Sequence, residues 1–92
     1  MYEITGIMVS RKPPTLETIT NYYFQGRNGE ASTWQTKQQG VNYVAANPSS
    51  VYVSGGGSTA SVEVVRNGAS PYLRTRADGT VSDNLLSQKI YN

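Results

Sequence analysis

The stretch PYLRTRADGTVSDNLLSQ, residues 71–88, decides how this chain completes its fold. Its first part, residues 72–75, suits a short β-strand because it combines aromatic, branched and long side chains. Alternation along a strand places Tyr72 and Arg74 on one face and Leu73 on the other. We therefore expect Leu73 to face the core.

The remainder of this stretch contains a turn followed by an apolar end. Residues 77–80 supply an aspartate that can bond its own backbone and a glycine that can adopt positive φ, so we expect the chain to reverse there. Ser82 or Asp83 can cap a short helical turn. Leu85 and Leu86 are then expected to fold back onto the sheet and hold the C-terminal segment in place.

The same residues resemble the closing segment of a family of small bacterial and phage domains of unknown function. In that family a Tyr-(Ile/Leu)-Arg-Thr strand is followed by an Asp-Asn-Leu turn, which corresponds here to residues 72–75 and 83–85. The resemblance extends to residues 4–7 and to a central helix. Where the family tends to continue with Leu-Pro, this chain has Gln and Lys at 88–89. The resemblance implies bacterial or phage origin and no particular activity.

Length and composition indicate one small soluble domain, residues 1–92. A chain of this length buries roughly 60–65% of its unfolded surface, which is enough for a modest core. Charged residues make up 15% of the sequence, below the ~25% of typical soluble domains, so uncharged polar residues and tyrosine must cover much of the surface. The net charge of +2 permits contact with nucleic acid or acidic proteins without requiring either.

The lack of histidine and cysteine removes the commonest catalytic groups. Without an imidazole base, a thiolate nucleophile or the usual transition-metal ligands, we expect no enzymatic activity, no metal and no cofactor. Asp78 and Asp83 could form a carboxylate pair, but turn and capping roles explain both. The sequence shows neither a long apolar segment nor a signal-peptide pattern, so we expect a cytoplasmic protein without a membrane span.

Hydrophobic periodicity predicts an α+β fold in the order β-β-α-β-β-β, with a mostly antiparallel sheet and one helix packed on it. The expected strands cover residues 1–10, 16–25, 49–54, 60–66 and 72–75. Apolar residues on both faces of the first strand indicate a central position, and it should pair antiparallel with the second. Asn67-Gly68 is typical of a two-residue hairpin turn before the last strand.

The helix is predicted over residues 37–46. Thr36 and Gln39 have the spacing of a capping box, in which each side chain bonds the other residue's free backbone N–H. Helical spacing groups three apolar residues on the face that should lie on the sheet. These are Val41, Val44 and Ala45.

Four further residues bear on how this helix packs and where it ends. Gly40 within it indicates either close packing or a frayed first turn. Tyr43 lies off the apolar face. Asn47 is expected to adopt the left-handed conformation after the helix, and Pro48 prevents its continuation.

Arg74 and Arg76 are the charges most suggestive of a binding site. If the strand persists through Arg76, both guanidiniums project beside Tyr72, which suits a phosphate or carboxylate next to an aromatic platform. The simpler interpretation pairs Arg74 with Glu63, or with either nearby aspartate, in a surface ion pair worth little more than ~1 kcal/mol.

Seven tyrosines, Phe24 and Trp34 give this short chain many aromatic rings. The rings could simply flank a small core, but tyrosine is also favoured at recognition surfaces. We expect a non-enzymatic binding module that self-associates or contacts another protein through a tyrosine-bearing sheet surface. The alternative is a nucleotide or nucleic-acid binder in which the arginines and Lys89 face phosphates while tyrosines stack on bases. The residues expected to make contact are Tyr52, Arg66, Tyr72, Arg74 and Arg76.

Overall fold

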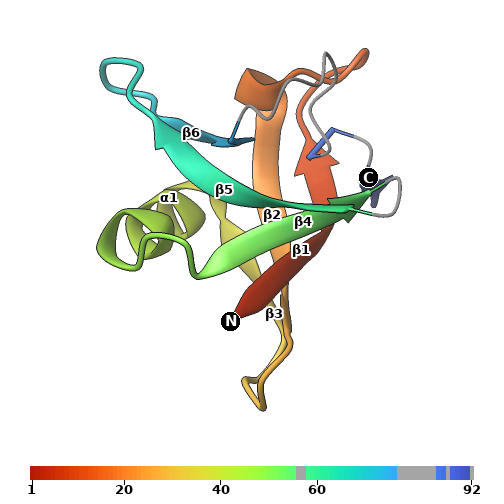
Figure 1. The fold of residues 1–92 in the computed structure, drawn as a ribbon. Coiled ribbons are helices and arrows are strands. Elements are labelled where there is room, and N and C mark those ends of the chain that lie inside the picture. The colour runs from red at the N-terminus through yellow and green to blue at the C-terminus, as the bar shows by residue number, and fades with distance from the viewer. Residues whose placement is uncertain (56–57, 77–84, 87, 92) are drawn as a thin grey trace.

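The computed structural model describes residues 1–55, 58–76, 85–86 and 88–91. The α-helix α1 (Lys37–Ala46) follows the first three strands. A short 3-10 helix, η1 (Leu16–Thr18), precedes the second strand. Figure 1 shows the arrangement. The strands are β1 (Tyr2–Val9), β2 (Ile19–Gly26), β3 (Thr33–Thr36), β4 (Val51–Gly55), β5 (Ser58–Val65), β6 (Tyr72–Thr75) and β7 (Lys89–Ile90). The predicted α+β class is confirmed.

The strands pair in the order β3-β2-β1-β4-β5-β6, and β7 also pairs with β1. The pairs β1–β4 and β1–β7 are parallel, whereas the other neighbouring pairs are antiparallel. One edge of β1 is shared, because Tyr2 and Glu3 pair with β4 while Gly6 and Ile7 pair with β7. The predicted central position of the first strand is therefore confirmed.

The sheet curls around its interior instead of lying flat. In Figure 1, β4 and β5 cross in front of β1 and β2, and α1 lies at one side. The helix contacts β2, β3, β5 and β6, so it packs against both walls of the curl. Tyr22 of β2 crosses the interior, where its hydroxyl accepts a hydrogen bond from the backbone N–H of Leu73 of β6 at 3.4 Å.

Apolar side chains from both walls form one core. Leu73 and Leu85 are fully buried in it, and Leu86 packs against it, as the sequence predicted. Burial of a leucine side chain contributes about 1.5–3 kcal/mol, so Leu85 fastens the C-terminal segment to the sheet. The buried apolar residues are Ile4, Ile7, Val9, Ile19, Tyr22, Phe24, Val41, Val44, Val51, Val53, Val62, Leu73 and Leu85.

The helix begins and ends where the sequence predicted. Thr36 Oγ1 accepts from the backbone N–H of Gln39 at 3.1 Å, and Gln39 Oε1 accepts from the backbone N–H of Thr36 at 2.9 Å. Gly40 is buried, and a Cβ added there would lie 2.9 Å from Tyr22 Cδ2. Of the two expectations for this glycine, close packing therefore holds.

The buried face of α1 is rotated relative to the prediction. Ala45 is exposed, whereas Tyr43 is half-buried against the core. The Tyr43 ring meets Tyr2 edge to face at 5.4 Å between ring centroids, and Phe24 at 5.9 Å. The bare backbone of Gly40 lets the helix approach the sheet on that side, so Tyr43 turns inward and Ala45 outward.

The chain leaves the helix differently from the prediction. Asn47 has φ −133° and ψ 72°, so it is not left-handed. Its backbone N–H and its side-chain amide both donate to the Tyr43 carbonyl, at 2.9 and 3.0 Å. These bonds end the helix without a positive φ, which occurs instead at Ser49 (φ 65°).

Two short strands and one longer loop depart from the predicted order. The predicted order lacked β3 and β7. β3 has four mostly polar residues and β7 has only two, so neither strand shows a recognisable hydrophobic periodicity. Val65 pairs with Tyr72, so residues 66–71 form the connection instead of a two-residue turn. Pro71 has no N–H to donate to the ladder. The predicted turn at 77–80 and cap at 82–83 lie outside the described residues.

Candidate functional site

Arg74 and Arg76 meet one carboxylate on the neighbouring strand. Arg74 Nε lies 2.8 Å from Glu63 Oε2, and Arg76 Nε lies 3.5 Å from Glu63 Oε1. Glu63 is the direct cross-strand partner of Arg74. Hydrogen bonds first from Arg74 and then from Arg76 hold the pKa of the Glu63 carboxyl below its ordinary value. Two guanidiniums and one carboxylate leave one positive charge, so a phosphate would have to compete with Glu63.

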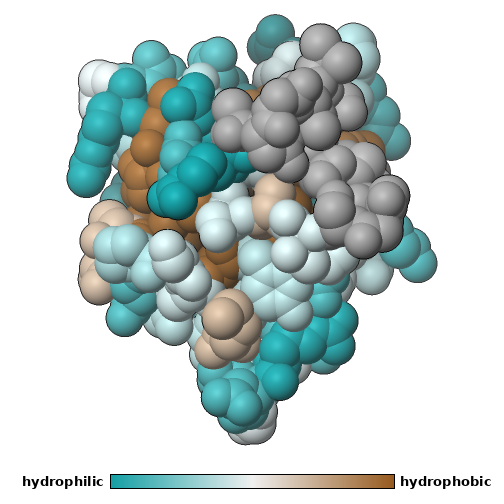
Figure 2. Space-filling view, in the orientation of Figure 1, coloured by the Kyte–Doolittle hydropathy of each residue, from teal (hydrophilic) through white to brown (hydrophobic). Residues whose placement is uncertain are grey.

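The ion-pair cluster borders a small hollow between α1 and β5. The hollow has a volume of about 170 Å³, and Val44, Val62 and Arg76 are among the residues that line it. Figure 2 shows brown apolar residues beside β5 among teal hydrophilic ones. This face therefore combines a partly neutralised charge cluster with a shallow apolar surface.

The other predicted contact residues lie in different surroundings. Lys37 Nζ lies 5.9 Å from the centroid of the Tyr72 ring. Arg66 is exposed in the loop after β5. Tyr52 is half-buried on β4 and lines an open hollow of about 610 Å³ that Arg27 also lines. Glu63 thus joins Arg74 and Arg76, and Tyr72 lies two residues before Arg74 on the same face of β6. Arg66 and Tyr52 lie elsewhere, in the loop after β5 and on β4.

A different cluster of side chains lies on the outer face of the sheet, away from α1. Cross-strand pairing aligns Gly6 of β1 with Tyr23 of β2, and Tyr23 with Trp34 of β3. Residues paired in this way project to the same face. The neighbours of Tyr23 along β2, Tyr22 and Phe24, are buried in the core, so Tyr23 and Trp34 point outward.

Tyr91 reaches this row of residues from β7. Its backbone N–H donates to the carbonyl of Ile7 at 3.0 Å and extends the β7–β1 ladder. Its ring lies over Gly6, where an added Cβ would stand 2.9 Å from Tyr91 Cδ1 and closer still to Cε1. A glycine is thus required beneath the ring.

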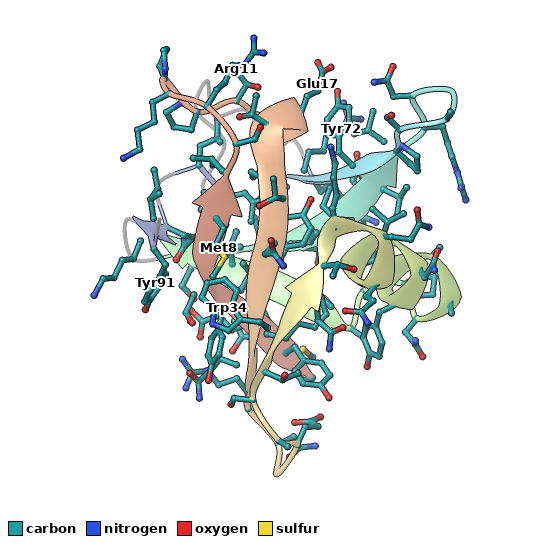
Figure 3. All side chains as sticks on the ribbon, turned by 180° about the vertical axis from the view of Figure 1, so that it is seen from behind. Met8, Arg11, Glu17, Trp34, Tyr72 and Tyr91 are labelled. Carbon is teal, nitrogen blue, oxygen red and sulfur yellow. The ribbon has the colours of Figure 1, made fainter. Side chains whose placement is uncertain are left out.

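Tyr23, Trp34 and Tyr91 meet edge to face, and we call these three residues the aromatic patch. The ring centroids of Tyr23 and Trp34 are 5.2 Å apart with an interplanar angle of 67°. Those of Trp34 and Tyr91 are also 5.2 Å apart, at 83°. Figure 3, which views this face directly, shows Trp34 and Tyr91 close together, with Met8 beside them.

The aromatic patch is partly open to solvent and carries a cation. Tyr91 is 51% exposed, whereas Tyr23 and Trp34 are half-buried. Lys89 Nζ lies 5.0 Å from the centroid of the Tyr91 ring, within the range of a cation–π interaction. The patch can therefore offer ring faces and a positive charge to the same ligand.

A second ion pair involves β1. Arg27 Nη2 lies 2.6 Å from Glu3 Oε1, and hydrogen bonding to this carboxylate raises the pKa of the Arg27 guanidinium.

Within the part of the chain that the structure describes, no cluster of acidic residues could hold a metal ion. None of the helices formed by those residues is long and apolar enough to cross a membrane.

Sequence reasoning missed the aromatic patch for identifiable reasons. Alternation along the second predicted strand does place Tyr22 and Tyr23 on opposite faces, which is a signal for one outward ring. Trp34 and Tyr91 belong to β3 and β7, the two strands absent from the predicted order. Only the register of these short strands aligns the three rings.

The fold and the patch define a small α+β domain with an aromatic surface on the outer face of a curled sheet. The chain belongs to the family described as Protein of unknown function (DUF3892), which it matches over residues 3–88. Membership of a family of unknown function is what the sequence resemblance implied, while the C-terminal motif itself stays a prediction. Neither the curated proteins nor the solved structures gave a match to this chain.

Proposed function

We propose that this domain is a non-enzymatic binding module that contacts its partner with the aromatic patch. The observation that carries this proposal is the position of Tyr91, whose half-exposed ring is held on the outer face of the sheet beside Trp34. Tyrosine and tryptophan offer large, rigid contact area with a polar end, which is why binding surfaces are enriched in them.

The geometry of the rings favours contact with a ligand over a purely covering role. An edge-to-face contact covers one face of only one of the two rings, so the patch keeps ring area open to a ligand. Tyr91 keeps about half of its surface in solvent.

The composition supports the absence of catalysis in this proposal. The 92 residues contain no histidine and no cysteine. Among the described acids, Glu3 and Glu63 are held by arginines and Glu30 by the N-terminal ammonium group. Hydrogen bonds from these cations lower the pKa of the Glu30 and Glu63 carboxyls, which makes both carboxylates weak general bases.

The test uses Trp34, which is the one tryptophan of the sequence. Its fluorescence and its indole N–H resonance would be followed during titration with the protein itself, short oligonucleotides, peptides and oligosaccharides. We expect at least one probe class to shift Trp34 saturably, with the probe recovered chemically unchanged.

Two matched variants complete this test. Tyr91→Ala should abolish the response of Trp34, whereas Tyr72→Ala, which removes a tyrosine from β6, should retain it. A Trp34 signal that no probe class changes, binding that survives Tyr91→Ala, or chemical conversion of a probe would overturn the proposal.

A further inference from the structure

We infer that the ligand of the aromatic patch is single-stranded nucleic acid. This inference rests on the proposed function, because it names the partner of the same surface. It shares Lys89 and stacking tyrosines with the nucleic-acid interpretation of the sequence, but the aromatic patch replaces Arg74 and Arg76 as the contact site.

The rings provide a stacking platform on a sheet. Every base has a flat π-face, so aromatic side chains on an open sheet surface can stack on successive unpaired bases regardless of sequence. The aromatic patch places three rings on β2, β3 and the segment after β7, with neighbouring centroids 5.2 Å apart and neighbouring ring planes at 67° and 83°, so each ring would receive a separate, splayed base. Bases within a duplex are already stacked on each other, so only a single strand can use this surface.

One positive charge at the patch and two beyond the end of β1 suit a polyanion. Lys89 Nζ lies over the face of the Tyr91 ring, 5.0 Å from its centroid, so a base that stacks on this face would displace the ammonium group toward the phosphate of its own nucleotide. Arg11 and Lys12 are exposed in the loop that follows β1. Figure 3 shows Arg11 beyond the end of β1, in the same view as Met8 and Tyr91.

Within the described residues, Arg11, Lys12 and Lys89 form no salt bridge, and Glu17 is the one exposed glutamate without a cationic partner. Three of the carboxylates that the structure describes are occupied by cations at other places: Glu3 by Arg27, Glu30 by the N-terminal ammonium group and Glu63 by Arg74 and Arg76. The formal net charge of the chain is +2.

A second copy of the domain fits this surface less well. A twofold interface places the same patch of both subunits face to face, so a dimer formed through the patch would bring two Lys89 side chains into one interface. Like charges juxtaposed in an interface are costly, whereas a phosphate backbone is attracted to them. The same cation thus favours nucleic acid and disfavours self-association.

The experiment compares charge and stacking variants with labelled oligonucleotides. Fluorescence anisotropy would measure the affinity for short oligothymidylate and oligouridylate, and for a duplex of the same length, while Trp34 emission reports stacking. We expect binding of the single strands with quenching of Trp34 and much weaker binding of the duplex. Tyr91→Ala should weaken binding by roughly tenfold to a hundredfold, as loss of one base–aromatic stack does elsewhere.

Lys89→Gln and Arg66→Gln form a matched pair, since each removes one exposed positive charge. We expect Lys89→Gln to lower the salt dependence of log K by about 0.7, the value of one phosphate contact on a single strand, and Arg66→Gln to leave it unchanged. Equal effects of the two variants would indicate diffuse attraction and would overturn the inference. A response of Trp34 to peptides or sugars but not to oligonucleotides would overturn it while leaving the proposed function standing.

Discussion

Replacement of Gly6 by alanine should displace Tyr91 from the outer face without unfolding the domain. The three atoms nearest to a Cβ at this position all belong to the Tyr91 ring, and Cδ1 would lie at 2.9 Å. Ordinary contact begins at about 3.4 Å. Because the ring is half exposed, it can move aside by about 1 Å.

The magnitude follows from two opposing contributions to the free energy of unfolding. The edge-to-face contact between Trp34 and Tyr91, worth about 0.5–1.5 kcal/mol, is lost. Replacement of glycine by alanine within a strand recovers about 0.5–1 kcal/mol of backbone entropy. The two terms nearly cancel, so the free energy of unfolding should change by less than about 1 kcal/mol. Trp34, in contrast, should become more exposed and its emission maximum should shift to longer wavelength.

A double-mutant cycle between Gly6 and Tyr91 isolates the contact. In the Tyr91→Ala background the ring is gone, so Gly6→Ala should become stabilising by about 0.5–1 kcal/mol in urea unfolding experiments. The same comparison for Trp34 emission should show no further red shift. Additive effects in the two backgrounds would refute the reasoning, because they would mean that the Tyr91 ring does not lie over Gly6 in solution.

Two further predictions concern the interior. Gly40→Ala should destabilise the domain by about 1–2 kcal/mol in urea unfolding, because the cost of overpacking, about 1–3 kcal/mol, exceeds the gain in helix propensity of up to ~1 kcal/mol. The new Cβ would lie 2.9 Å from the ring of Tyr22, which is fully buried and has no room to move away. Asn42→Ala, on the exposed side of the helix, is the control. A Gly40→Ala variant more stable than the original protein would contradict the close contact between Gly40 and Tyr22. Burial raises the pKa of Tyr22 to about 12, and the hydrogen bond from the Leu73 N–H opposes this only in part. Since the folded state keeps the phenol of Tyr22 neutral, its contribution to the free energy of unfolding is complete below pH 10. About 2–3 kcal/mol of this contribution is lost as the pH rises from 10 toward 12. Tyr22→Phe should lack this alkaline loss of stability, and equal losses in both proteins would show that the hydroxyl is not buried.

The helix and the longer strands could be predicted because their signals are local. The capping box at Thr36 and Gln39 fixes the start of α1, and the predicted range of the helix matches the structure. Residues 72–75 likewise form a strand as expected, with Leu73 buried. In each of these segments the local propensity and the tertiary contacts favour the same conformation.

The curl of the sheet and the aromatic patch could not be predicted because they depend on register. The β1–β2 ladder shifts between Ile4 and Gly6, which is a departure from simple alternation. As a result Ile4 and Ile7, three residues apart, both face the core, and Gly6 falls on the outer face opposite Tyr23. A shift of one residue in a strand reverses every side chain that follows, and nothing in the local composition marks its position.

The C-terminal segment links the stability of the fold to the aromatic patch. Leu85 is fully buried, and six residues later Tyr91 lies on the opposite face of the same sheet. Between Leu85 and Tyr91, β7 pairs with Gly6 and Ile7 of β1, on the edge of β1 whose first residues pair with β4. This short strand therefore completes the sheet, and it also places Lys89 and Tyr91 on the outer face. Because β7 has only two residues, its pairing alone is weak, and the buried Leu85 supplies the anchor. Leu85→Ala should therefore lower the proposed affinity for oligonucleotides as well as the free energy of unfolding, although the Leu85 side chain lies on the far side of the sheet from the aromatic patch.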